Sequence, residues 1–210
     1  MTDDRSLYIV FEGIDGAGKS SQIARLTERL VARGETPVRT FEPTRGPHGS
    51  EIRRRAAEGP PMTAAEELAL FVADRRDHVR DVVAPALARG DVLLQDRSFY
   101  STAAYQSARG AGAESAPSIA EVLAANAFAP RPDLVVLLDL PAAEALRRVT
   151  GRGPADAFED LDRLRAVREA FLSLADERFR VFDATLPPDR LADRIAAAAL
   201  PLLDQRRSLP

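Results

Sequence analysis

The chain has 210 residues, a formal net charge of -3, 29% charged residues and no cysteine. The missing cysteines exclude disulfides, thiolate metal sites and cysteine nucleophiles, and the lack of an overall positive charge argues against nucleic acid as the main partner. The start of the chain has no positive signal-peptide region and no apolar run approaches the roughly 20 residues that span a bilayer, so we expect a cytoplasmic protein with no membrane partner.

Short apolar runs alternate with helical patterns along the chain. We predict strands at Leu7–Phe11, Val38–Phe41, Val92–Gln95, Leu134–Leu138 and Phe179–Phe182. Helices are predicted at Lys19–Arg33, Ala64–Leu87, Ser101–Arg109, Ala142–Val149, Leu161–Glu177 and Arg190–Leu200. The strand runs lack polar alternation, as in a parallel sheet that is covered on both faces. The pattern therefore predicts one α/β domain over residues 1–210, with a five-stranded parallel sheet and helices on both faces.

Two prolines bear on the helix boundaries. Pro85 lies inside the second predicted helix, and we expect it to kink or end that helix because proline has no N–H and clashes with the preceding turn. The tail that follows Asp204 contains a further proline and is expected to fray.

The segment after the first predicted strand fits the phosphate-loop pattern G-x-x-x-x-G-K-[ST]. It reads Gly13, Ile14, Asp15, Gly16, Ala17, Gly18, Lys19 and Ser20, and Ser21 follows. We predict that these nine residues bind ATP, because glycines let backbone N–H groups approach phosphate oxygens at a helix N-terminus. Lys19 is predicted to reach the β and γ phosphates and to be catalytic, and the Ser20 hydroxyl to bind Mg²⁺. The alternative is a glycine-rich turn that binds nothing, which the strand-to-helix context argues against. The motif predicts a P-loop NTPase fold.

Asp96 and Arg97 follow the third predicted strand, at the carboxyl edge where α/β sheets bind ligands. The carboxylate of Asp96 is predicted to hold Mg²⁺ directly or through water, and Arg97 offers a planar fork to an acceptor phosphate. The alternative for this pair is a surface salt bridge at a strand end.

The phosphate loop alone does not separate a kinase from a GTPase or a motor ATPase. The sequence has no Asn-Lys-x-Asp segment of the kind that reads guanine, and the chain is small for a motor. A kinase with a small-molecule acceptor is therefore favoured.

Four blocks of sequence carry a resemblance to a known family. They are the phosphate loop with its flanks from Phe11 to Gln22, the segment from Glu42-Pro43 to Glu51-Ile52-Arg53, the segment Phe71–Arg75, and Asp96-Arg97 followed by Ser101–Gln106. In this order and spacing the chain resembles the thymidylate kinase family from Tyr8 to about Pro187. Two positions depart from the family pattern, because Phe41 stands where an Arg usually precedes Glu-Pro and Ser98 replaces the Tyr or His that follows Asp-Arg.

The resemblance implies that the enzyme phosphorylates thymidine monophosphate (dTMP) with ATP and Mg²⁺, in the supply of thymidine triphosphate, and that it is a homodimer. In the family the acid at Asp15 reaches the 3'-hydroxyl, the Phe at Phe71 stacks on thymine and the Arg at Arg75 contacts a base carbonyl. The predicted acceptor-binding set is Asp15, Phe41, Arg45, Arg53, Phe71, Arg75, Arg97, Thr102, Tyr105 and Gln106. Phe71 and Arg75 lie four apart on one predicted helical face, and Thr102, Tyr105 and Gln106 lie three and four apart on another. The alternative for Phe71 and Tyr105 is a role as ordinary core aromatics.

The family also has a mobile lid with arginines after its fourth strand, here near residues 147–158. Arg147, Arg148 and Arg152 occupy that region, and we predict that Arg97, Arg148 and Arg152 neutralise charge during transfer. The phosphate loop has Ala17 where some members have an Arg, so the lid is expected to supply this charge. Two alternatives stay open, namely a P-loop kinase for another nucleotide or nucleoside and a non-catalytic nucleotide-binding module.

Overall fold

The computed structural model describes residues 5–58, 62–109, 116–149 and 156–208, with the backbone alone for 156–160. Within these ranges five strands form one parallel sheet in the order β2-β3-β1-β4-β5. The strands are β1 (Leu7–Glu12), β2 (Val38–Phe41), β3 (Val92–Asp96), β4 (Leu134–Asp139) and β5 (Phe179–Asp183). The predicted five-stranded parallel sheet of a P-loop NTPase fold is thereby confirmed.

The central strands are buried and the edge strands are not. All six residues of β1 are buried, as are most residues of β3 and β4. In the edge strand β2, half-buried residues alternate with exposed ones, because successive side chains point to opposite faces of the sheet. The buried centre of the sheet, formed by β1 and its neighbours β3 and β4, is therefore the most rigid support for a loop.

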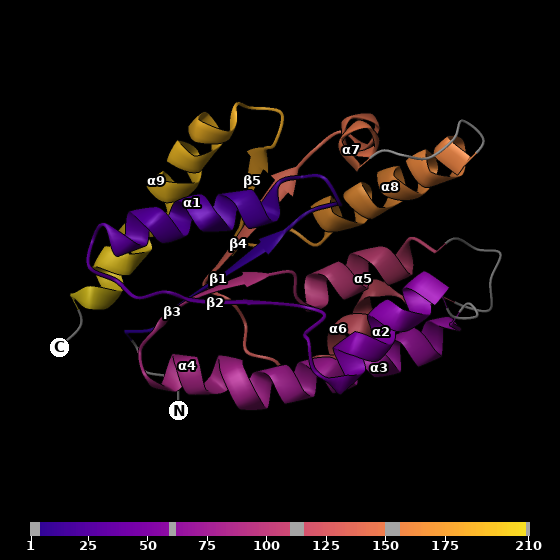
Figure 1. The fold of residues 1–210 in the computed structure, drawn as a ribbon, viewed down its shortest axis with the longest axis horizontal. Coiled ribbons are helices and arrows are strands. Elements are labelled where there is room, and N and C mark those ends of the chain that lie inside the picture. The colour runs from indigo at the N-terminus through magenta and orange to yellow at the C-terminus, as the bar shows by residue number, and fades with distance from the viewer. Residues whose placement is uncertain (1–4, 59–61, 110–115, 150–155, 209–210) are drawn as a thin grey trace.

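Helices cover both faces of the sheet (Figure 1). They are α1 (Lys19–Val31), α2 (Pro47–Glu58), α3 (Ala64–His78), α4 (Ala84–Ala88), α5 (Phe99–Ser107), α6 (Ile119–Ala125), α7 (Ala142–Val149), α8 (Asp156–Ser173) and α9 (Pro188–Arg207). Figure 1 shows α1 and α9 together on one side, with α3 and α4 on the other. Successive side chains of β1 point to opposite faces of the sheet. Tyr8 and Val10 pack with Leu87 of α4, while Ile9 and Phe11 belong to the larger core. No helix in the described ranges is long and apolar enough to cross a membrane.

The helix that contains Pro85 changes its winding before the proline. Between α3 and α4 lies a π-helical turn, η1 (Val79–Val83), in which the N–H of Ala84 donates to the carbonyl of Val79. Pro85 then occupies the first turn of α4. Because proline has no N–H, the wide turn just before it accommodates the missing donor without ending the helical run. The predicted irregularity is therefore present, but one turn earlier than Pro85.

Three parts of the helical prediction differ from the structure. The prediction omitted α2, which begins at Pro47. Position 49 in this helix requires glycine, because a Cβ there would lie 2.1 Å from the carbonyl oxygen of Thr44. It also omitted the short helix α6, although Ser118 and Glu121 form a capping box at its start. The expectation of a frayed tail after Asp204 was wrong for the described residues, because α9 continues to Arg207.

Candidate active site

The phosphate loop connects β1 to α1 at the carboxyl edge of the sheet. Gly13 has φ 138°, and a Cβ on it would lie 2.6 Å from the carbonyl oxygen of Leu138, so the loop packs directly on the end of β4. Lys19 turns back over this loop, with its Nζ 3.0 Å from the Gly13 carbonyl and 3.2 Å from the Ile14 carbonyl. Burial, with Arg97 nearby, lowers the pKa of Lys19 to about 8.

Ser20 and Asp96 lie together beside the loop. The Ser20 hydroxyl donates to Oδ2 of Asp96 at 2.7 Å, while the buried Oδ1 of Asp96 has no partner among the described residues. A hydroxyl and a carboxylate are ligands that fit Mg²⁺. Within the described ranges no cluster of three or more His, Asp or Glu could hold a metal, so phosphate oxygens and water would have to complete such a coordination shell.

Arg97 has a strained backbone that turns its side chain toward the loop. Its φ is 67°, which is uncommon outside glycine, and its N–H donates to the Phe11 carbonyl at 3.0 Å. The guanidinium donates to Asp15 Oδ1 at 2.7 Å and to Ser101 Oγ at 2.9 Å, and it lies 5.2 Å from the centre of the Tyr105 ring. Burial acts to raise the pKa of Asp15, but Arg97 and Lys19 outweigh it and hold that pKa below its ordinary value.

Glu12 is a residue that sequence reasoning passed over. It lies at the end of β1 with no exposed surface, and burial raises its pKa. Ser98 donates to it through both N–H and Oγ at 2.8 Å, and Ser101 Oγ donates at 2.5 Å. The departure at Ser98 therefore has a structural role, because this hydroxyl binds Glu12 and also caps α5 by accepting from Tyr100 N. A lone acid inside an apolar run was the signal that could have found Glu12.

Two cavities meet at this edge of the sheet. One, of about 760 Å³, lies over the phosphate loop and is lined by Lys19, Ser20, Asp96 and also Phe41. The second, of about 330 Å³, lies between α3 and α5. It brings together the predicted base-pocket residues Phe71, Arg75, Thr102, Tyr105 and Gln106. Asp15 and Arg97 line both cavities.

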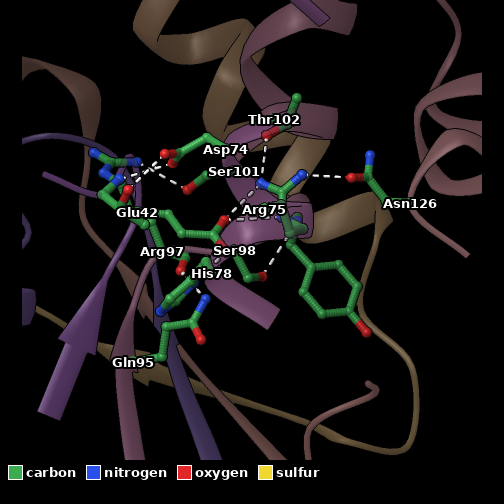
Figure 2. Close-up of polar contacts among 12 residues, drawn as sticks. Glu42, Asp74, Arg75, His78, Gln95, Arg97, Ser98, Ser101, Thr102 and Asn126 are labelled. Carbon is green, nitrogen blue, oxygen red and sulfur yellow. Dashed lines mark hydrogen bonds and ion pairs between the residues drawn. The ribbon is translucent and has the colours of Figure 1, made fainter. Parts of the chain in front are cut away.

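Arg75 is fixed in a buried hydrogen-bond network at the back of the smaller cavity (Figure 2). Its Nε and Nη2 donate to Oε2 of Glu42 at 2.9 Å and 2.6 Å. Its Nη1 donates to Oδ1 of Asn126 at 2.5 Å, and its Nη2 also donates to Oγ1 of Thr102 at 3.1 Å. A guanidinium has five N–H groups, so the contacts within the described residues use four of them and leave one on Nη1.

Glu42 is held from its other side by His78. The His78 Nδ1 lies 2.9 Å from Glu42 Oε1, and its Nε2 lies 2.6 Å from the Thr40 hydroxyl. Burial acts to raise the pKa of Glu42, but Arg75 and His78 outweigh it and lower that pKa. Neither Glu42 nor Asn126 was predicted to have a role, and His78 was assigned no catalytic one. Glu42 stood in a block that carries the family resemblance, but no local pattern indicated the partners of these three residues, because those partners lie far away in the sequence.

Three predicted acceptor-binding residues lie apart from the base pocket. Arg53 donates to the carbonyls of Pro43 at 2.8 Å and Thr44 at 2.5 Å, and Arg45 lies 5.7 Å from the centre of the Phe41 ring. Arg45 and Arg53 line neither of the two cavities, while Phe41 lines only the larger one.

The predicted lid arginines are only partly within the described chain. Arg148 lies against the outside of the phosphate loop and donates to the carbonyls of Gly16 and Ala184, each at 3.3 Å. Arg147 forms an ion pair with Glu144. Arg152 and residues 150–155 lie outside the described residues. Asp139, at the end of β4, forms an ion pair with Arg168 of α8 at 2.5 Å.

Comparison with known proteins gives a consistent picture. The family model described as thymidylate kinase matches residues 11–195. A protein named thymidylate kinase from Xanthomonas oryzae pv. oryzae (strain PXO99A) is 45% identical over 198 residues, which cover 92% of this chain and 84% of that relative. A protein of the same name from Desulfotalea psychrophila is 42% identical over 186 residues, covering 88% of this chain and 89% of the relative.

Proposed function

The chain belongs to the thymidylate kinase family, and on this premise we propose that it transfers the γ-phosphoryl group of ATP to thymidylate to form thymidine diphosphate. The observation that carries the proposal is that Asp15 and Arg97 line both the cavity over the phosphate loop and the adjacent pocket. A donor phosphate in one cavity and an acceptor phosphate in the other would therefore meet at the same two side chains.

On the donor side, Lys19 and the loop N–H groups bind the phosphates of ATP. The ammonium now donates to two loop carbonyls, and these are weaker partners than phosphate oxygens, so it can turn outward when ATP binds. Mg²⁺, when bound, neutralises phosphate charge, and Ser20 with Asp96 would hold it. The support is the unpartnered Oδ1 of Asp96 next to the Ser20 hydroxyl.

On the acceptor side, thymidylate lies in the smaller pocket with its base on Phe71 and a base carbonyl at the remaining N–H of Arg75. Its phosphate is bound by Arg97, whose planar fork has two terminal nitrogens directed at Ser101 and Asp15. Asp15 is ionised, as its lowered pKa indicates, and accepts from the sugar 3'-hydroxyl. The reaction then needs positioning and charge neutralisation more than covalent chemistry from the protein.

Two finer points belong to the same proposal. We propose that residues 147–158 act as a lid whose arginines, Arg148 and Arg152, add positive charge over the transferring group. We propose as well that the protein acts as a homodimer, which sedimentation at several concentrations would test.

The test is release of ADP from ATP and Mg²⁺ with a panel of monophosphates, namely thymidylate, deoxyuridylate, uridylate, cytidylate and guanylate. We expect the highest kcat/KM with thymidylate. Better turnover with another acceptor would contradict the substrate assignment and keep the kinase, and ATP binding without turnover on any acceptor would contradict the enzyme itself.

A further inference from the structure

One buried acceptor in the base pocket has no partner. The side chain of Gln106 is almost fully enclosed, at 2% exposure, yet its Oε1 makes no hydrogen bond within the described residues. Buried amide oxygens nearly always have a partner, because an unpaired one has lost its hydrogen bonds to water without replacement. Gln106 also lines the smaller pocket, so a ligand there is the partner that its position allows.

The orientation of the Gln106 amide is set by an ion pair between Glu67 of α3 and Arg109, which follows α5. Its Nε2 lies 3.4 Å from Oε2 of Glu67, and Nη2 of Arg109 lies 2.5 Å from the same oxygen. An ionised carboxylate only accepts hydrogen bonds, so Glu67 binds the N–H₂ group of the Gln106 amide. The amide oxygen of Gln106 then points away from Glu67. Arg109 is also held at its other nitrogen by the carbonyl of Met62 at 3.3 Å.

Glu67 is placed for this role by the spacing of α3. It lies four residues before Phe71 and eight before Arg75, so the three side chains lie along one face of the helix. All three line the smaller pocket. The wall of the pocket thus offers a donor from Arg75 and, from Gln106 of α5, an acceptor.

We infer that Glu67, together with Arg109, is a positioning residue that fixes Gln106 with its Oε1 toward the base, so that the pocket selects a pyrimidine whose ring nitrogen carries a hydrogen. This inference rests on the proposed function and deepens it. Thymine and uracil have an N–H between two carbonyls, whereas cytosine has an unprotonated ring nitrogen beside an amino group. An acceptor fixed at this position therefore pairs with the first two and faces a lone pair in the third.

The test replaces Glu67 by methionine (Glu67→Met), which keeps a similar length but removes the acceptor that Arg109 and Gln106 share. Neither orientation of the Gln106 amide is then fixed from behind the pocket wall, and the selection at the ring nitrogen is lost. The acceptors are thymidylate, deoxyuridylate and 5-methyldeoxycytidylate, the last of which differs from thymidylate only along the edge in question. We expect the ratio of kcat/KM for thymidylate to that for 5-methyldeoxycytidylate to fall at least about tenfold.

Two comparisons separate positioning from a general structural role. The ratio for thymidylate to deoxyuridylate should stay unchanged, because these two bases share the same edge and differ only by a methyl group. The matched control is Glu66→Met, since Glu66 is the adjacent acid on α3 but belongs to the capping box with Thr63. It should leave both ratios as they are.

Equilibrium binding of the same nucleotides is measured alongside turnover, together with thermal unfolding. An unchanged thymidylate to 5-methyldeoxycytidylate ratio in Glu67→Met, or a parallel loss for all three nucleotides, would overturn the inference. If the native protein binds thymidylate selectively but does not phosphorylate it, the proposed function fails while the binding ratio still decides the role of Glu67. If it does not bind thymidylate selectively, both fail.

Discussion

Lys19 is enclosed by the same loop that is to receive phosphate, and this couples nucleotide binding to protonation. In the free protein its pKa is about 8, so the ammonium loses its proton as the pH rises through that value. Bound phosphates favour the charged form and raise the pKa. Between pH 8 and the raised pKa, binding must take a proton from solvent, and affinity for ATP should fall as the pH rises.

We therefore predict uptake of about one proton when the nucleotide binds near pH 9, which calorimetry in buffers of different ionisation enthalpy would measure. Lys19→Arg is the control, because a guanidinium stays charged throughout this range and should show almost no linked uptake. Equal proton uptake by the two proteins would contradict the assignment to Lys19. Lys19→Met should reduce turnover at every pH, since phosphate loses its cation.

Arg75 balances the buried charge of Glu42, so its removal should affect the whole fold as well as the pocket. We predict that Arg75→Met lowers the free energy of unfolding by about 3–5 kcal/mol, because the buried carboxylate of Glu42 then keeps only His78 as a partner in the part of the chain that the structure describes. Urea unfolding would measure this loss of unfolding free energy. The neighbouring Arg76, whose Cζ lies 4.2 Å from the centre of the Phe128 ring, gives the control Arg76→Met, expected to cost about 1 kcal/mol or less. Similar losses in both variants would contradict the role of the buried pair.

At the residue scale, sequence reasoning pointed to the side chains that we propose bind ligand, and it missed the side chains that hold them in place. Lys19 and Arg75 stand in motifs whose spacing is dictated by phosphate and base, so a local pattern reveals them. Glu42 and Asn126 reach Arg75 across 33 and 51 positions of the chain. No local period predicts such partners, because they are brought together only by the packing of α3 against the ends of other elements.

At the scale of elements, the helix that carries the base-pocket residues depends on its first turn. Thr63 caps α3 by accepting from the N–H of Glu66, and Glu66 accepts in return from the N–H of Thr63. We predict that Thr63→Ala lowers the free energy of unfolding by about 1 kcal/mol. Glu66→Gln keeps the reciprocal bond, because glutamine also accepts from the backbone, and should cost only a few tenths of a kcal/mol. Urea unfolding of the two variants would measure both losses. An unchanged free energy of unfolding in Thr63→Ala would show that the cap does not stabilise the protein.

The strands were predictable as elements because each is a short apolar run with few alternatives. The helix α2 was not, since Pro47 and Gly49 are poor helix formers and the segment is stabilised from outside. The carboxylate of Asp74 receives both the N–H and the hydroxyl of Thr44, just before the helix begins. Tertiary contacts therefore outweigh the low helix propensity of these residues. The same holds in α9, which continues past Pro201 to Arg207.

At the scale of the whole molecule, the end of α9 joins segments at the amino edge of the sheet. Arg207 pairs with Glu35 at 2.6 Å and donates to the carbonyls of Arg5 and Gly90, each at 3.1 Å. Arg206 pairs with Asp133 at 2.6 Å. We predict that a chain shortened after Asp204 loses about 1–3 kcal/mol of unfolding free energy, as partly exposed charged hydrogen bonds allow.

The control for this deletion is a chain shortened after Arg207, which keeps all of these contacts and should unfold like the full chain. Thermal unfolding of the three proteins would measure the difference. Equal stability of both shortened chains would show that α9 is held by its apolar face alone.

The strand order has a consequence for synthesis of the protein. The loop motif is complete by residue 20, but β1 lies between β3 and β4, and the loop packs on the carbonyl of Leu138. On a ribosome the motif therefore emerges long before either flanking strand exists. A nascent chain cannot close the loop, so nucleotide cannot assist early folding, and an arrested translation product carries the full signature of a nucleotide site with no site formed.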